Sequence, residues 1–204
     1  MLGIIDYGSG NLYAFESIYK QLSTPFRFIR SVEDFDECSH IILPGVGDYD
    51  ETLRLLNNKG FVEKLNQWIT NESNFFLGVC VGMQILGSFS EEGSQRGFNW
   101  IPGEIKKIPD RHDGSLVRLP HMGWNSLKIV KETGLFSNVD LEVGAYFLHN
   151  YEFVAQDSKS VVCTTDYFKK ITSVVNKGNI YGIQFHPEKS LKNGVTVLNN
   201  FANL

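Results

Sequence analysis

Cys80 lies in a sequence context that differs from that of an ordinary buried cysteine. The segment FFLGVCVGMQ (residues 75–84) runs from an apolar stretch through Gly-x-Cys-x-Gly into a helix-like stretch. This is the pattern of a nucleophile elbow, with cysteine in place of serine. Glycines beside such a strained turn let the chain and a substrate approach closely. We therefore expect Cys80 to attack an electrophilic carbon as a thiolate.

Backbone N–H groups near Cys80 are candidates for stabilising the negative charge that such an attack creates. A helix that starts after Cys80 would aim free N–H groups and the positive end of its dipole at the sulfur, which favours the thiolate. The Val81 N–H would face a developing oxyanion. The segment IILPGVG (residues 41–47) ends a strand-like run with two glycines around one residue. Such a loop can expose further N–H groups to the oxyanion.

A base for the nucleophile is predicted far downstream, in the segment YGIQFHPEK (residues 181–189). A thiolate nucleophile needs a base that accepts and returns a proton, and this base needs a group that orients it. Residues two apart on an extended chain face the same side, and proline favours an extended conformation for the residue before it. His186 and Glu188 can therefore meet, with Glu188 holding the imidazole in one tautomer.

The other cysteines and histidines carry no recognisable motif. Three cysteines without a CxxC pair argue against a disulfide framework and against a zinc cluster, and Cys38 and Cys163 are predicted to be structural. The histidines outside the HPE segment, which show no metal-ligand spacing with each other, are His40, His112, His121 and His149. We therefore expect neither a metal nor a cofactor.

The composition argues against several classes of function. The 204 residues are 42% hydrophobic and 21% charged, with a net charge of -4, which is ordinary for a globular protein. No basic run is present that would attract nucleic acid. The N-terminus lacks the pattern of a signal peptide, and the apolar runs are far below the roughly 18 residues of a membrane helix. We expect a cytosolic protein that binds neither nucleic acid nor a membrane.

The first half of the chain alternates strand-like and helix-like segments. The strand candidates are residues 2–6, 26–29, 40–43 and 75–79. The helix candidates are residues 11–22 and 48–70, the second interrupted at Gly60. This alternation indicates a largely parallel sheet with helices on its faces. Ligands of such sheets bind beyond the carboxyl ends of the strands, where Cys80 is expected.

The second half reads as shorter strands joined by turns. The strand candidates are residues 144–148, 160–165, 171–176 and 179–185, with a hairpin turn at 177–179 and a closing helix over 195–201. No internal repeat or linker is present. We predict one α/β domain over residues 1–204, with an antiparallel β addition in its second half.

The joint pattern of PGVG, GVCVGMQ and GIQFHPEKS resembles the class I (triad-type) glutamine amidotransferases over the whole chain. Members of this family have a flavodoxin-like fold and hydrolyse L-glutamine through a Cys-His-Glu triad. The resemblance implies that Cys80, His186 and Glu188 form this triad. It also implies that Gly47, Gln84 and the backbone around Asn150 and Tyr151 hold the substrate. Oxyanion N–H groups would come from Val81 and, after a peptide rearrangement, from Val46.

Three further segments are similar to the glutaminase subunits of imidazole glycerol phosphate synthase: IDYGSGNL (5–12), PHMGWN (120–125) and YFLHNY (146–151). Those subunits pass ammonia to a (β/α)8 cyclase subunit in a heterodimer. The cyclase then makes imidazole glycerol phosphate and an aminoimidazole carboxamide ribotide in histidine biosynthesis. The resemblance places four residues near the cyclase: Asn11, Trp124, Tyr146 and Lys189. Trp124 and Tyr146 could equally be core aromatics, and Lys189 a solvated surface charge.

Some positions depart from the pattern of these subunits, and they leave the ammonia acceptor open. Val81 stands where leucine is usual, Asn150 replaces serine or threonine, and residues 97–100 read GFNW. One alternative is a paralogous glutaminase that supplies ammonia to an N-acetyl sugar amidotransferase in surface-polysaccharide biosynthesis. A non-enzymatic module that keeps the fold is another, although the complete set of Cys80, His186 and Glu188 argues against it. Gln84 and the PGVG loop favour a small amide over a peptide substrate.

Overall fold

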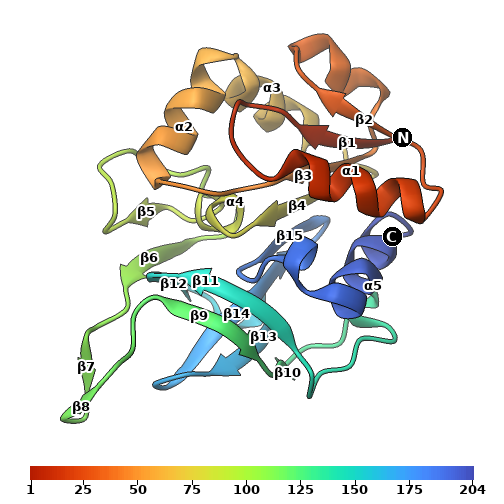
Figure 1. Cartoon of the computed structure of the whole chain (residues 1–204). Coiled ribbons are helices and arrows are strands. Elements are labelled where there is room, and N and C mark those ends of the chain that lie inside the picture. Colours follow the sequence, from red (N-terminus) through yellow and green to blue (C-terminus); the bar gives the residue numbers. More distant parts are fainter.

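The computed structural model describes residues 1–204 and is built around an eight-stranded mixed sheet (Figure 1). Five strands are parallel, in the order β2-β1-β3-β4-β15. Their bounds are β1 (Leu2–Ile5), β2 (Phe26–Ile29), β3 (His40–Leu43), β4 (Phe75–Val79) and β15 (Ile180–Ile183). This is the flavodoxin-like order, in which the carboxyl ends of neighbouring strands share one edge. The predicted fold class is confirmed.

The sheet continues beyond β15 with antiparallel strands, as expected for the second half of the chain. These are β14 (Lys170–Lys177), β13 (Val161–Asp166) and β10 (Lys128–Ile129). The predicted hairpin turn is confirmed: Lys177 pairs with Ile180, and Gly178 between them has a φ of +59°. Glycine suits this position because it adopts positive φ without a steric penalty.

Helices cover both faces of the sheet. One face is packed by α1 (Leu12–Gln21) and α5 (Leu191–Phe201), and the other by η1 (Val32–Glu37), α2 (Tyr49–Asn58), α3 (Phe61–Trp68) and α4 (Val81–Gln84). Side chains of a strand alternate between the two cores: Ile42 belongs to the first, whereas Ile41 and Leu43 belong to the second. The long predicted helix divides at Gly60, which has a φ of +72°. The closing helix begins one turn earlier than expected.

Smaller sheets flank the antiparallel half (Figure 1). A two-stranded ribbon joins β9 (His121–Asn125) to β11 (Ala145–His149), and a second sheet joins β12 (Tyr151–Ala155), β6 (Gly103–Lys107) and β5 (Phe89–Ser90). A short hairpin consists of β7 (Arg111–His112) and β8 (Ser115–Leu116). The remaining 3₁₀ turns are η2 (Gly134–Phe136), η3 (Ser158–Ser160) and η4 (Pro187–Lys189). None of the helices combines the length and apolar character needed to cross a membrane.

Candidate active site

The Cys80 elbow is a strained turn at the carboxyl edge of the sheet. Cys80 follows β4 directly and has a φ of +54°, which a residue with a side chain rarely adopts. Its N–H donates to the Ile183 carbonyl at 2.8 Å, so the elbow is tied to β15. A Cβ on Gly78 would lie 2.2 Å from the Gly82 carbonyl oxygen, and one on Gly82 would lie 2.5 Å from the Leu43 carbonyl oxygen. Both glycines are therefore required by the tight turn.

The helix after the elbow differs from the expectation. Helix α4 spans only four residues, from Val81 to Gln84. A macrodipole sums over aligned peptide units, so a single turn contributes little of the expected stabilisation of a thiolate. The individual N–H groups of the elbow, rather than a helix dipole, remain the candidates for holding negative charge.

The PGVG loop lies beside the elbow at the end of β3. The backbone N–H groups of Val46 and Gly47 donate to no backbone carbonyl. The Val46 carbonyl, in contrast, accepts a hydrogen bond from the Ser9 hydroxyl at 2.8 Å. This loop therefore offers unused donors next to the cysteine, and its one strongly held group is a carbonyl.

His186 and Glu188 lie in contact under the surface. His186 Nδ1 is 2.9 Å from Glu188 Oε1, and the two side chains are only 2% and 1% exposed. Glu188 belongs to the 3₁₀ turn η4, so a turn rather than an extended chain brings the two together. Because the carboxylate accepts, Nδ1 carries the hydrogen and Nε2 stays available. The His186 N–H donates to the Tyr146 carbonyl at 2.8 Å, which anchors this segment to β11.

The raised pKa of His186 suits a residue that stabilises a thiolate. Burial lowers the pKa of His186, but hydrogen bonding to the Cys80 and Glu188 side chains outweighs it and raises the pKa to about 10. The imidazole therefore stays protonated at neutral pH, where it can stabilise a thiolate and later donate its proton. Cys38 and Cys163 lie in the two cores, where burial raises their thiol pKa values to about 11 and about 12. Neither is suited to act as a nucleophile at neutral pH.

Gln184 is a contact of the nucleophile that the sequence interpretation missed. It is fully buried, and its Nε2 lies 3.6 Å from Cys80 Sγ. Gln84 Nε2 donates to Gln184 Oε1 at 3.2 Å, so the two amides form one buried pair beside the sulfur. A signal was available, because Gln184 and His186 stand two residues apart at the end of the same strand-like segment.

One cavity of about 200 Å³ collects the predicted substrate and oxyanion residues around the nucleophile. It is lined by Val46, Gly47, Cys80, Val81, Gln84, Glu92, Leu148, His149, Asn150, Tyr151 and His186. Glu92 was not predicted, and no sequence motif marks it. One of its carboxylate oxygens accepts the Tyr49 N–H at 3.1 Å. Burial, helped by Asp48, raises the pKa of Glu92, so the cavity contains a carboxylate that lacks a cationic partner.

His149 of the cavity is paired with a second buried histidine. Its Nε2 lies 2.9 Å from His121 Nδ1, although the sequence showed no relation between the two. Burial lowers the pKa of His121 to about 4. Burial, together with the neighbouring His121, lowers the pKa of His149 to about 3. Both rings are therefore neutral at neutral pH.

This pair predicts a loss of stability in mild acid. Below a pH of about 6.5 the two histidines are protonated in the unfolded chain but stay neutral in the folded protein. The free energy of unfolding therefore falls as the pH drops toward 4. At pH 5 each histidine should cost about 2 kcal/mol of unfolding free energy. Urea unfolding at pH 7 and pH 5 measures this, and His121→Phe should lose about 2 kcal/mol less than the wild type. Equal losses in both proteins would contradict the assignment.

Three of the four residues predicted to face a partner lie together at the β9–β11 ribbon. Trp124 and Tyr146 stand opposite each other on the β9–β11 ribbon, and Trp124 is 44% exposed. The ammonium group of Lys189 lies 5.8 Å from the centre of the Tyr146 ring, a cation–π contact. Asn11 precedes α1 and is exposed, and its side chain does not cap the helix. These four residues remain candidates for a partner surface.

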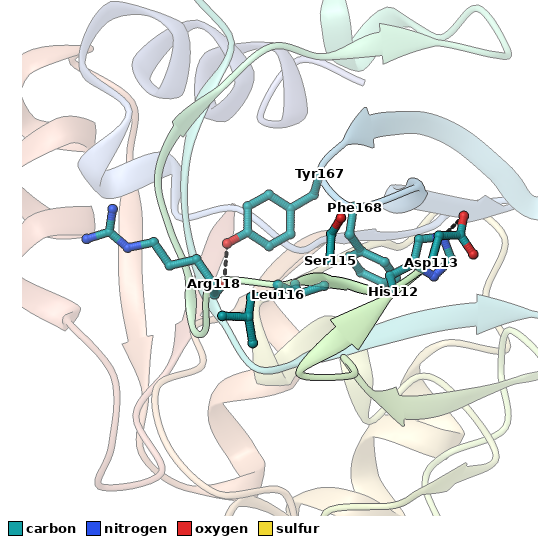
Figure 2. A pocket seen from close by; sticks show the side chains of 8 residues that line it. His112, Asp113, Ser115, Leu116, Arg118, Tyr167 and Phe168 are labelled. Atoms are coloured by element: carbon teal, nitrogen blue, oxygen red, sulfur yellow. Dashed lines mark hydrogen bonds and ion pairs between the residues drawn. The ribbon is translucent and has the colours of Figure 1, made fainter.

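A larger cavity, of about 390 Å³, lies between the β7–β8 hairpin and the segment Tyr167–Phe168 and lacks comparable chemistry (Figure 2). Its wall includes His112 and Phe168, and the Tyr167 hydroxyl donates to the Arg118 carbonyl oxygen. The acid within ion-pair distance of His112 is Asp113, whose side chain is 91% exposed. This cavity shares no residue with the one around Cys80 and contains no nucleophile with a buried base. No group of three or more potential metal ligands is found in the structure.

The fold and this arrangement agree with the comparison to known protein families. Residues 4–203 match the family described as "Glutamine amidotransferase class-I". The chain belongs to the class-I glutamine amidotransferase family. Among solved structures it is similar to PurLQS from Thermotoga maritima, with a TM-score of 0.72, 17% identity and 99% and 97% of the two chains covered. A glutamine amidotransferase from Thermotoga maritima has a TM-score of 0.63, 16% identity and 92% and 75% coverage.

Relatives that align over the full length of the chain show which members of the family it resembles. The "Imidazole glycerol phosphate synthase subunit HisH" of Leptospira borgpetersenii is 44% identical and covers 100% of both chains. The subunits of the same name from Leptospira interrogans and Bdellovibrio bacteriovorus are 40% and 37% identical, again with 100% of each chain covered.

Proposed function

We propose that residues 1–204 form one glutaminase domain that hydrolyses L-glutamine to glutamate and ammonia. The observation that supports the proposal is that Cys80 and His186 line the same cavity and that Glu188 is hydrogen-bonded to the His186 imidazole. Its volume of about 200 Å³ suits a small amino acid. No cofactor is needed, because a thiolate, a base and backbone donors suffice for amide hydrolysis.

The reaction follows from these positions. The Cys80 sulfur attacks the side-chain amide carbon, and the oxyanion is held by the N–H groups of Val81 and, after rearrangement of the PGVG loop, Val46. His186 gives its proton to the leaving nitrogen, so ammonia departs and a γ-glutamyl thioester remains. Water then loses a proton to His186 as it attacks the thioester carbon. The C–S bond breaks, which releases glutamate and restores the thiolate and the imidazolium.

Recognition of the amino-acid end of glutamine requires a counter-charge for its ammonium group. Glu92 is the cavity carboxylate that lacks a cationic partner, since Glu188 is bound to His186. We assign Glu92 to the ammonium group. Gly47, Gln84 and the backbone of Asn150 and Tyr151 complete the proposed substrate site.

Replacing this carboxylate should weaken substrate binding. Loss of a charge-assisted hydrogen bond costs about 1.5–3 kcal/mol, so Glu92→Gln should raise the KM for glutamine about 10- to 100-fold with a smaller change in kcat. The matched control is Glu91→Gln, because Glu91 is exposed and lies outside the cavity. Steady-state glutamate release measures both parameters. An unchanged KM in Glu92→Gln would remove Glu92 from the substrate site.

The relatives indicate where the ammonia goes. They are named as subunits of imidazole glycerol phosphate synthase, which favours the histidine-pathway acceptor over the N-acetyl sugar amidotransferase. The chain would pair with a (β/α)8 cyclase subunit in a cytosolic heterodimer, with Asn11, Trp124, Tyr146 and Lys189 on the shared surface. The delivered ammonia would yield imidazole glycerol phosphate and the aminoimidazole carboxamide ribotide.

A glutaminase assay with and without the partner tests this proposal. Glutamate release should be slow for the isolated chain and should rise strongly when the cyclase subunit of the same organism and its nucleotide substrate are added. The Val46 N–H is proposed to act only after the PGVG loop rearranges, and we expect the partner to bring about this rearrangement. If only a sugar-modifying enzyme stimulated glutamate release, the acceptor in histidine biosynthesis would be wrong. If no glutamate were released with either partner, the glutaminase proposal would be overturned.

A further inference from the structure

Side chains of the β9–β11 ribbon form a chain of hydrogen bonds that ends on the backbone of the active-site cavity. His121 and His149 stand directly opposite each other in the ribbon. Asn125 Nδ2 lies 3.3 Å from His121 Nε2, and His121 Nδ1 lies 2.9 Å from His149 Nε2. His149 Nδ1 lies 2.7 Å from the Tyr151 carbonyl oxygen, within the segment 148–151 that lines the cavity.

The chain of hydrogen bonds has only one possible direction. A carbonyl oxygen can only accept, so His149 Nδ1 must carry a hydrogen. His149 Nε2 is then the acceptor for His121 Nδ1–H, and His121 Nε2 accepts from the Asn125 amide. Both rings are thus neutral, with the hydrogen on Nδ1. If either Nε2 bound a proton, two N–H donors would face each other in a buried contact with no acceptor between them. Leaving buried donors without an acceptor destabilises the folded state.

Packing holds the two rings in this arrangement. His121 and His149 are only 2% and 6% exposed. The His121 ring is stacked on Phe147, with centroids 4.6 Å apart, and on Tyr167, with centroids 4.0 Å apart. A fully satisfied polar network in a buried site favours one arrangement of the groups it joins.

The hydrogen bond to Tyr151 spans the place where the chain changes sheets. His149 is the last residue of β11 in the ribbon, Asn150 is the single connecting residue, and Tyr151 is the first residue of β12 and pairs with Lys107 of β6. The connecting segment faces the nucleophile, because the Leu148 carbonyl oxygen lies 3.9 Å from Cys80 Sγ.

We propose that His121 and His149 are positioning residues, whose directed hydrogen bonds hold the backbone of residues 148–151 in the conformation that binds the substrate. The inference rests on the proposed glutaminase function. Neither ring takes or gives a proton in the reaction. Each ring affects the reaction only by fixing the position of the Tyr151 carbonyl, and this position in turn determines where glutamine binds in the cavity.

Variants of His149 separate positioning from a general loss of stability. His149→Leu removes the donor to the Tyr151 carbonyl and should raise the KM for glutamine about tenfold or more, with a smaller fall in kcat, because the triad remains. His149→Asn places an amide N–H near the former Nδ1–H and should recover most of the lost affinity. The matched control is His40→Leu, since His40 is stacked on Phe75 at the opposite end of β3 and should leave KM unchanged.

Glutamate release by the complex with the cyclase subunit gives both kinetic parameters, and thermal unfolding gives the stability of each variant. An unchanged KM in a folded His149→Leu protein would overturn the proposal, and so would equal loss of affinity in His149→Leu and His149→Asn. If His149→Leu does not fold, His121→Phe replaces it, because this variant keeps the ring stacking and loses both hydrogen bonds.

A spectroscopic measurement on the wild-type chain needs no variant and no activity. Nitrogen-15 NMR of the histidine rings at neutral pH should show two neutral imidazoles with the hydrogen on Nδ1, the less common tautomer of free histidine. A hydrogen on Nε2 of either ring, or a cationic ring, would overturn the proposal. If the wild-type complex releases no glutamate but the two Nδ1–H rings are found, the glutaminase assignment fails and the hydrogen-bond chain stands.

Discussion

Cys80→Ala should abolish glutamate release while the partner subunit in the same complex still works with added ammonium. Removing the nucleophile of a catalytic triad typically costs at least about 10⁴-fold in kcat. The variant should fold, because a methyl group fits wherever a thiol does and the backbone at position 80 keeps its neighbours. Cysteine, which has a Cβ, adopts the φ of +54° at this position, so alanine should adopt it as well.

The control for this variant is Cys38→Ala. Cys38 is 5% exposed, lies in the core on the α2–α3 side of the sheet, and is not part of the cavity. It should keep its glutaminase activity with a modest loss of stability. Glutamine hydrolysis by Cys80→Ala at more than trace rates would show that another group is the nucleophile.

Glu188→Gln should lower kcat about 10²- to 10⁴-fold, as loss of the orienting carboxylate does in other triads. The 2.9 Å contact to His186 Nδ1 is the one hydrogen bond of this buried carboxylate within the protein, and Oε2 has no partner. A neutral amide keeps the shape but no longer supports the imidazolium, and its NH₂ group can turn toward the ring and force the wrong tautomer.

The same variant should change the pH dependence in a defined direction. The folded-state pKa of His186 is raised to about 10, so the imidazolium is present at neutral pH and is lost only as the pH rises through that value. Removing the carboxylate removes one of the two groups that raise this pKa, so the alkaline fall in kcat/KM should move to lower pH. Glu132→Gln, at an exposed position, is the control. An alkaline limb at the same pH in wild type and Glu188→Gln would contradict the role of Glu188.

The parts of the site that could be predicted are those encoded by local chain geometry. The elbow around Cys80 follows from glycines that leave no room for a Cβ, and β3 and β4 occupy the ranges that their apolar runs indicated. His186 and Glu188 are adjacent in sequence, so their contact depends on one short turn. The contact was predicted from an extended chain, but in the structure it is made by a 3₁₀ turn.

The parts that escaped prediction depend on contacts between distant segments. Glu92 reaches the cavity from a loop after β5, and its role is visible only once that loop packs against the N-terminus of α2. His121 and His149 lie 28 residues apart and meet because antiparallel pairing of β9 with β11 sets them opposite each other. The length of helix α4 was not predicted: it is a single turn, Val81–Gln84, packed against β4 and β15.

Covalent labelling of the complex with a diazoketone analogue of glutamine tests most directly whether Cys80 is a glutamine-specific nucleophile. Peptide mass spectrometry should find the label on Cys80 alone among the three cysteines, and excess L-glutamine should protect it. Label on Cys38 or Cys163, or labelling of Cys80 that glutamine does not slow, would contradict the account.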